Sequence, residues 1–363
     1  MDERIFRAKI GYPIPAWDAS HRLPISGCVG PEVSDSATIF RINSTYMEVS
    51  DQPHMMRHWL AGGALMSFLT AILFLGVGLN VFYFHPPTHG DFADIFMVVI
   101  LTLSPMIFAV TAYYLGRDEF FSLSRRPIRF NRCTKKLYAV RKRDKTFRSF
   151  SGDIFCEAPW DENSIFCVHQ GPEKFDLQNC YHIRCYQTDA KGNVTNAFSI
   201  GREWQGVDGM RELLAQWNYW CLFMNQGPAA LPKPLLYLSE REKLSDSFLY
   251  CLYEMGFSLP QILRTIISPF AILITLHRII SLWTCRQPIW TKSVLEDSYV
   301  DPADIYDQPR GETPVGWAEA VRARREDRYP RFPSCEAVGW SGLADPMKNA
   351  KQWVDRPPVG EKQ

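Results

Sequence analysis

The chain has 363 residues, of which 46% are hydrophobic, so it is long and apolar enough for one large domain or two modest ones with a buried core. Its 40 Lys and Arg nearly balance its 39 Asp and Glu, which excludes a strong overall attraction to nucleic acid or to an acidic surface. The informative feature is where the charged residues are absent.

Two long uncharged segments lie close together in the first third of the chain. Residues 59–84 would form a helix of roughly 39 Å, and residues 95–116 one of roughly 33 Å, at a rise of about 1.5 Å per residue. Both exceed the hydrocarbon core of a bilayer, which is about 30 Å thick. The ten residues between them contain Pro86, Pro87 and Gly90, which favour a turn. We therefore predict a transmembrane hairpin over residues 59–116.

The distribution of positive charge predicts the orientation of this hairpin. Seven Lys and Arg fall within residues 117–136, directly after the second helix, whereas the turn at 85–94 has none. Because positive residues stay on the cytoplasmic side, we expect the N-terminal segment 1–58 and the chain after residue 116 to lie in the cytoplasm. The ten cysteines are then expected to be reduced thiols.

Short segments rich in β-branched and aromatic residues follow the hairpin. They lie at 128–130, 136–141, 146–150, 164–169, 181–188 and 194–200, and residues 37–49 before the hairpin predict a further strand or hairpin. Gly192 in the 189–193 loop predicts a tight turn between the last two strands. Residues 207–225 then show apolar side chains at helical spacing.

These elements predict an α+β membrane protein. We expect residues 117–234 to form a mainly antiparallel cytosolic β domain, a pleckstrin-homology-like barrel or sandwich that is closed by one helix. Residues 1–58 are expected to contribute a strand to it.

A helical region over residues 235–295 is predicted next, and it contains a third apolar segment at 262–283. Arg264, His277 and Arg278 interrupt that segment, so its longest uncharged run is only 12 residues, and Pro269 would kink it. A run of this length favours an interfacial or packed helix. A third membrane crossing is the alternative, and it would move everything after Leu282 to the other side. Residues 296–363 are predicted to be an irregular, Pro-rich tail.

The motifs of common enzymes are absent from the sequence, including the phosphate-binding loop, the His-Glu-x-x-His zinc motif and the Gly-x-Ser-x-Gly nucleophile motif. His54 and His58 share a helical spacing but lack a third ligand, and Cys180, His182 and Cys185 do not share one face of a strand. We expect a protein that is not an enzyme and that has no cofactor and no metal. An unrecognised membrane enzyme is the alternative, with these candidate residues: Asp153, Glu157, Asp161 and His182.

Two sets of residues are candidates for binding. Lipid head groups would attract the juxtamembrane arginines, although these also fit a topogenic signal and solvated strand edges. The five candidates for head-group contact are Arg117, Arg125, Arg126, Arg129 and Arg132. Tryptophan is enriched at protein interfaces, although a core or membrane-interface position is the simpler explanation for each one. The four candidates for partner binding are Trp160, Trp204, Trp283 and Trp290. Nucleic acid is not an expected partner, because the basic segment is tethered to the bilayer and lacks a stacking motif.

Several local motifs resemble those of a poorly characterised family of bacterial inner-membrane proteins whose genes lie near type VI secretion genes. The resemblance runs from Trp59 to Pro232. It rests on the paired helices and on these segments: Pro127-Ile-Arg-Phe-Asn-Arg132, Pro159-Trp160-Asp161, Trp217-Asn-Tyr-Trp220 and Gly227-Pro-Ala-Ala-Leu-Pro232. The segment beyond Pro234 departs from this pattern.

The resemblance implies a protein of the bacterial inner membrane, and together with the distribution of Lys and Arg we expect a multi-pass protein with both termini in the cytoplasm. It further implies a role in type VI secretion, either as an immunity protein that binds a cognate toxin or as an accessory protein that assists toxin loading. An anionic-lipid-binding scaffold is the alternative. Glycines at 62, 63, 76 and 78 are compatible with an oligomer, because they allow helices to approach closely.

Overall fold

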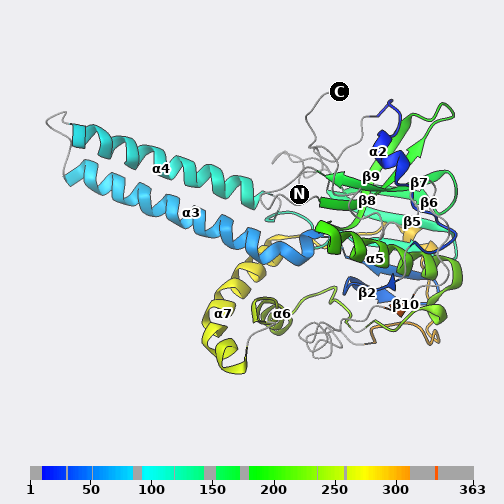
Figure 1. Ribbon diagram of the computed structural model, residues 1–363. Coiled ribbons are helices and arrows are strands. Elements are labelled where there is room, and N and C mark those ends of the chain that lie inside the picture. The colour runs from blue at the N-terminus through cyan, green and yellow to red at the C-terminus, as the bar shows by residue number, and fades with distance from the viewer. Residues whose placement is uncertain are drawn as a thin grey trace.

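A long two-helix arm projects from a mixed α/β domain in the computed structural model of this chain (Figure 1). The structure describes residues 10–29, 32–50, 52–84, 92–117, 119–142, 153–171, 180–234, 236–256, 260–310 and 332–333. The predicted strand at 146–150 and most of the predicted irregular tail lie outside these residues.

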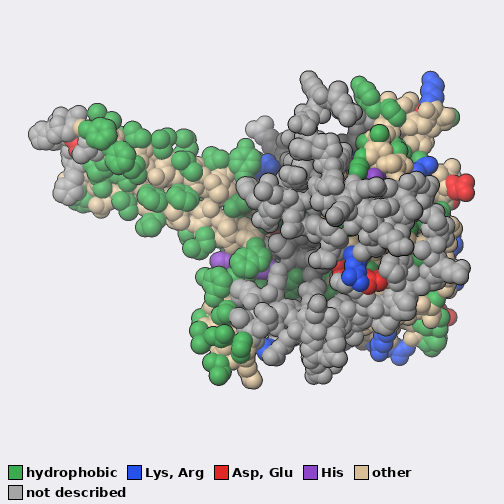
Figure 2. Space-filling view, in the orientation of Figure 1, with side chains coloured by type: hydrophobic (Ala, Val, Ile, Leu, Met, Phe, Trp, Pro, Cys, Tyr) green, Lys and Arg blue, Asp and Glu red, His purple; other side chains and the backbone are tan. Residues whose placement is uncertain are grey.

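The arm consists of α3 (Gln52–Phe84) and α4 (Phe92–Gly116), which confirms the two predicted helices. Within them, Arg57–Phe84 and Asp94–Gly116 are long and apolar enough to cross a membrane. Their large side chains are mostly exposed, and Figure 2 shows hydrophobic side chains covering the arm on the side in view. Such a surface fits a lipid environment, so the chain is consistent with a membrane protein.

The arm is inserted between two neighbouring strands of one sheet. β3 (Tyr46–Val49) precedes α3, β4 (Ile128–Asn131) follows α4, and the two strands pair antiparallel with Val49 opposite Ile128. Both ends of the hairpin therefore start from the same end of the same sheet. Two crossings by these helices would return the chain to the side from which it left.

That sheet has five antiparallel strands in the order β2-β3-β4-β5-β6. Its other members are β2 (Ile39–Ile42), β5 (Lys136–Lys142) and β6 (Asp153–Pro159). A second sheet contains β7 (Ser164–Gly171), β8 (Cys180–Thr188) and β9 (Val194–Gln205), and β1 (Glu32–Val33) pairs with β10 (Phe332–Pro333). None of these sheets closes in the described residues, so the α+β class is confirmed whereas a pleckstrin-homology-like barrel is not.

Helix α5 (Gly206–Gln226) packs on strands of all three sheets and provides one wall of the main core, as its amphipathic sequence predicts. Trp217 and Trp220 are fully buried, and the ring of Trp217 lies 5.3 Å from that of Trp160 and 5.2 Å from that of Phe166. Burial of such large rings contributes about 2–3 kcal/mol each. This aromatic cluster joins β7 to the connection after β6, and so it holds the two larger sheets together.

Gly201 in β9 has a conformation that a side chain would disturb. Its φ is +74°, and a Cβ atom there would lie 2.6 Å from Cη2 of buried Trp220. Gly192, in the predicted turn, has a φ of +80° but open space around it. We expect Gly192→Ala to cost about 1–2 kcal/mol of unfolding free energy through backbone strain, and Gly201→Ala to cost about 1–3 kcal/mol more through overpacking. Urea unfolding of the two variants side by side measures this difference, and equal losses would contradict it.

The remaining helices lie near the base of the arm or at the edges of the domain. These are α2 (Ala16–Ser20), the 3-10 turn η1 (Pro228–Ala230), α6 (Leu244–Gly256), α7 (Gln261–Thr284) and α8 (Lys292–Asp297). Helix α7 coincides with the third apolar segment and is also long and apolar enough to cross a membrane. It packs against α6 and against the first turns of α3.

Candidate functional site

A buried arginine fixes the base of the arm to the domain. Arg57 lies in the first turns of α3 and is 2% exposed. Its guanidinium donates five hydrogen bonds of 2.7–3.1 Å, to the carbonyl oxygens of Glu119, Leu123 and Ser124, to Ser281 Oγ and to Cys285 Sγ. One of its nitrogens also lies 3.7 Å from the Glu119 carboxylate. This single side chain therefore joins α3, the connection from α4 to β4, and the end of α7.

A second buried charge cluster centres on Glu48 in β3. The carboxylate is fully buried and accepts hydrogen bonds from Arg125 and Arg129, with Arg129 Nη2 at 2.7 Å. Burial raises the pKa of Glu48, but attraction to the two guanidinium groups outweighs it, so the pKa lies below its usual value. Glu48 is directly opposite Arg129 in the antiparallel register, which explains how strand pairing brings them together.

A third pair joins α7 to the segment before α6. Arg278 is fully buried, and its Nε and Nη2 donate to the two carboxylate oxygens of Glu242 at 2.6 and 2.7 Å. Its guanidinium carbon lies 4.6 Å from the centre of the Tyr250 ring. The bidentate geometry fixes the start of α6 against the second half of α7.

A cavity of about 260 Å³ opens between these clusters. Its wall consists of Ser124, Arg125, Ser239, Glu240, Arg241, Glu242, Leu282, Trp283 and Gln287. Arg125 and Glu242 are held by buried partners, whereas the Glu240 carboxylate is half-exposed and lies 3.4 Å from Arg125. The Arg241 side chain is exposed, and Trp283 is 83% exposed. The cavity therefore combines fixed charges at its floor with a cation and an indole at its rim.

The structure places three of the five predicted lipid-contact arginines inside the protein. Arg125, Arg126 and Arg129 are 6–8% exposed, and Arg129 additionally lies against the rings of Tyr46 and Trp290. Arg117 is half-buried over Tyr114, and Arg132 is half-buried near the Ser44 carbonyl. Burial of these three guanidinium groups makes contact with a head group less favourable for them than for Arg117 and Arg132. Contact with lipid stays a prediction for all five arginines.

The four predicted partner-binding tryptophans are not brought together. Trp160 and Trp290 are buried, Trp204 is half-buried against the main core, and only Trp283 is widely exposed. Trp283 lies at the rim of the cavity. The sequence analysis missed the charged members of that rim, Glu240 and Arg241, because nothing in the linear sequence places them beside the end of α7.

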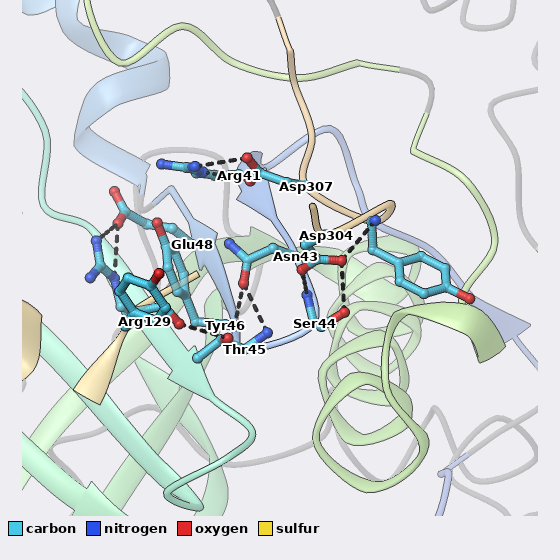
Figure 3. Close-up of polar contacts among 11 residues, drawn as sticks. Arg41, Asn43, Ser44, Thr45, Tyr46, Glu48, Arg129, Asp304 and Asp307 are labelled. Carbon is cyan, nitrogen blue, oxygen red and sulfur yellow. Dashed lines mark hydrogen bonds and ion pairs between the residues drawn. The ribbon is translucent and has the colours of Figure 1, made fainter. Parts of the chain in front are cut away.

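The chain after α8, residues 298–310, binds the turn between β2 and β3, and we call this contact the clasp. Asp304 accepts hydrogen bonds from the Ser44 backbone N–H at 2.7 Å and from Ser44 Oγ at 2.8 Å, and Asp307 forms a bidentate pair with Arg41 (Figure 3). Backbone bonds between Ile42 and Gln308 add to this contact. The start of the predicted irregular tail is thus bound to the five-stranded sheet by specific polar contacts.

We expect Asp304→Ala to weaken this clasp. Removal of the carboxylate leaves the Ser44 N–H without its acceptor, and the expected loss is about 1–2 kcal/mol of unfolding free energy. Asp301→Ala serves as the control, because Asp301 accepts a hydrogen bond from Ala303 N in its own turn. Limited proteolysis should cut the 298–310 segment faster in Asp304→Ala than in the control, and equal rates would contradict the role of Asp304.

The four residues of the enzyme alternative lie in separate contacts. Asp153 pairs with Arg286, Glu157 pairs with Lys136 at 2.7 Å, and Asp161 accepts hydrogen bonds from Asn163 in a turn. His182 is buried, with its ring 4.9 Å from that of His169. In the part of the chain that the structure describes, no three His, Cys, Asp or Glu residues are grouped as metal ligands.

A buried carboxylate that sequence analysis missed lies beside these histidines. Asp18 in α2 is fully buried and accepts hydrogen bonds from the Tyr186 hydroxyl and from His169 Nδ1 at 2.7 Å. Arg184 donates to the Tyr186 hydroxyl at 3.2 Å. Backbone bonds from Val168 to His21 and from Leu23 to Phe166 run alongside. The cluster therefore fastens the N-terminal segment to the outer sheet of three strands.

The arm, the junction and the adjoining cavity define an α+β protein with helices long and apolar enough to span a membrane and with buried polar contacts that join its domain to the base of the hairpin. The chain belongs to the family of unknown function DUF6708, whose profile matches residues 105–302, more than half of the chain. The match reaches from the second half of α4 to the segment just after α8, so it includes α6, α7 and the cavity. No curated protein and no solved structure matches the chain.

Proposed function

We propose that this chain is a non-enzymatic, membrane-anchored binding protein, and that it captures a protein partner at the cavity beside the base of its hairpin. The observation that carries the proposal is the rim of that cavity, where Arg241 and Trp283 are exposed beside the half-exposed Glu240 and the fixed Arg125. Tryptophan and arginine dominate the energetics of protein interfaces, and a preformed, rigidly held site binds at a lower entropic cost.

The sharpest form of the proposal is a type VI secretion-associated immunity protein at the bacterial inner membrane, with both termini and the domain in the cytoplasm. The cluster of Lys and Arg after α4 supports the cytoplasmic placement. The resemblance to proteins encoded near type VI secretion genes supports the association with toxins. A domain fixed at the membrane surface would meet a toxin that acts at or near the bilayer.

Co-expression of the full chain with each toxin encoded near its gene tests this function. Protection from one toxin, with a stoichiometric complex on pull-down, is the expected result. Arg241→Glu and Trp283→Ala should abolish both at unchanged membrane levels, whereas Lys292→Glu, at a highly exposed position of α8, should retain both. Complex formation without protection would favour the accessory or loading role. Neither binding nor protection with any of these toxins would overturn the proposal.

An anionic-lipid-binding scaffold is the second candidate function, and the outward apolar side of α7 favours it. It predicts that the full chain in nanodiscs recruits vesicles that contain phosphatidylglycerol and releases them in salt. Recruitment that does not respond to salt would count against it.

A further inference from the structure

Helix α7 buries several polar side chains and exposes most of its large apolar ones. Its buried side includes Thr275, His277, Arg278 and Ser281, which face α6 and the base of α3. Apart from Trp283 at the rim of the cavity, its exposed side carries these large apolar side chains: Ile262, Leu263, Ile266, Phe270, Ile272, Leu273, Leu276 and Ile280. A continuous apolar surface of this kind is unfavourable in water and marks a contact with lipid or with a partner.

Both ends of the chain segment that contains α6 and α7 are bonded to the same domain. Before α6, the Leu238 N–H donates to the Ile39 carbonyl in β2 at 2.8 Å. After α7, the Arg286 N–H donates to the Ser122 carbonyl at 2.9 Å, and Ser124 N–H donates back to the Arg286 carbonyl at 2.8 Å. A chain that leaves and re-enters a domain on one side of a membrane crosses that membrane an even number of times.

Among the described residues of this segment, only α7 is long enough for a crossing. Helix α6 has 13 residues, which at a rise of about 1.5 Å per residue reach roughly 20 Å, well below the roughly 30 Å of a hydrocarbon core. Its first turn also contains the buried Asp246. A crossing by α7 would therefore have no return crossing. The length and composition of α7 would allow it to cross a membrane, but the contacts at the two ends of this segment are incompatible with a single crossing.

We infer that α7 lies along the surface of the membrane at the base of the hairpin, with its outward apolar side in the lipid of the leaflet nearest the domain. In Figure 1, α7 runs at a steep angle to α3 and α4, as a helix in the membrane plane would beside two spans. His277 lies against Gly62 of α3, where a Cβ atom would come within 2.7 Å of the imidazole. This close approach fixes α7 at the level where the arm leaves the domain.

Lipid is the occupant that the surroundings of this side favour. The exposed side chains of α7 are of the same kind as those of α3 and α4, and Figure 2 shows hydrophobic side chains on the arm and on α7. Helices that bind a membrane surface bury one apolar side about 5–10 Å into the boundary between head groups and acyl chains. In this chain, protein covers the polar side of α7 that such helices usually expose to water.

Labelling of single cysteines from either side of the membrane tests the topology. The background replaces Cys133, Cys156, Cys285 and Cys335 by Ser. Gln261→Cys and Gln287→Cys then mark the two ends of α7, native Cys133 restored alone marks the domain side, and Thr88→Cys marks the turn of the hairpin. With an impermeant maleimide, we expect Gln261→Cys and Gln287→Cys to label from the side of Cys133 and Thr88→Cys from the other. Labelling of Gln261→Cys only from the side of Thr88→Cys would make α7 a span and overturn the inference.

Nitroxide labels separate a helix in lipid from one packed beside water. Ile266, Leu273 and Ile280 lie on one stripe of α7, seven residues apart. In the full chain in lipid nanodiscs, we expect labels at all three positions to collide with oxygen more than with a water-soluble nickel chelate, and to show equal depth. A depth that peaks at position 273 would indicate a span. Preferential collision with the nickel chelate would indicate that no lipid covers α7, and either result would overturn the inference.

Discussion

Replacing Arg57 by Met is expected to detach the base of the arm from the domain and to lower the unfolding free energy by about 3–5 kcal/mol. The substitution keeps much of the side-chain volume but removes all five hydrogen bonds of the guanidinium. Three buried carbonyl oxygens then lose a donor, and the buried Glu119 loses its cation. Arg57→Lys should show a smaller but definite loss, because one ammonium group carries three donors and cannot reach all of these acceptors.

Urea unfolding of the full chain in detergent, followed by tryptophan fluorescence, measures this loss. Arg41→Met is the matched control, because it also removes a bidentate arginine, but from a pair with Asp307 that is partly exposed at both ends. We expect the control to lose about 1 kcal/mol or less. In addition, we expect limited proteolysis to cut the 119–126 connection in Arg57→Met but not in the control. An Arg57→Met protein as stable as the control would show that this junction contributes no more than a surface pair.

The sequence predicts the arm well because the signal is carried by composition alone. A run without charged residues that exceeds the thickness of a bilayer has few alternatives, and both helices form where it predicts. Helix α3 nevertheless begins at Gln52, seven residues before the predicted start. Arg57 and His58 lie in that extension, and both are buried in the junction rather than exposed at a membrane surface. The sequence shows that these two side chains are polar, but only the fold shows which groups surround them.

The fate of the juxtamembrane arginines could not be predicted from their own segment. A cluster of arginines after a transmembrane helix is typical of a lipid-facing surface. Here the chain returns to the five-stranded sheet, and Arg125 and Arg129 are buried there against Glu48. The partner, Glu48, lies 77 and 81 residues earlier, on the other side of the hairpin. One signal was present: Glu48 stands inside the predicted strand at 37–49, where a carboxylate on a buried strand requires a cationic partner.

The contacts of the 298–310 segment and of the α6–α7 segment could not be predicted from the sequence for a related reason. Residues 298–310 contain little regular structure, as their composition predicts, yet Asp304 and Asp307 bind the β2–β3 turn through side-chain geometry that no periodic pattern encodes. Likewise, the even number of membrane crossings inferred for the α6–α7 segment follows from backbone contacts at its two ends, which only the three-dimensional structure provides. Periodicity and charge predict elements, whereas long-range polar pairing decides which surfaces they leave free.

Replacing Glu48 by Gln is expected to produce the second large loss, again about 3–5 kcal/mol, because it leaves Arg125 and Arg129 buried without their shared carboxylate. The control is Glu157→Gln, which breaks the exposed pair with Lys136 and should cost about 1 kcal/mol or less. A triple variant, Glu48→Leu with Arg125→Met and Arg129→Met, should recover much of the loss, since apolar side chains of similar volume can replace a buried charge cluster.

The pH dependence distinguishes loss of this charge from a packing defect. The pKa of Glu48 is lower in the folded protein than its usual value, because Arg125 and Arg129 outweigh the effect of burial. Its stabilisation is therefore complete above the unfolded pKa of about 4.3 and is lost as the pH falls through the lower folded pKa. Urea unfolding between pH 7 and pH 3 should show a steeper loss for the wild type and Glu157→Gln than for Glu48→Gln. If Glu48→Gln lost stability with acid as steeply as Glu157→Gln does, the buried carboxylate would not be the charge that holds these two arginines in the sheet.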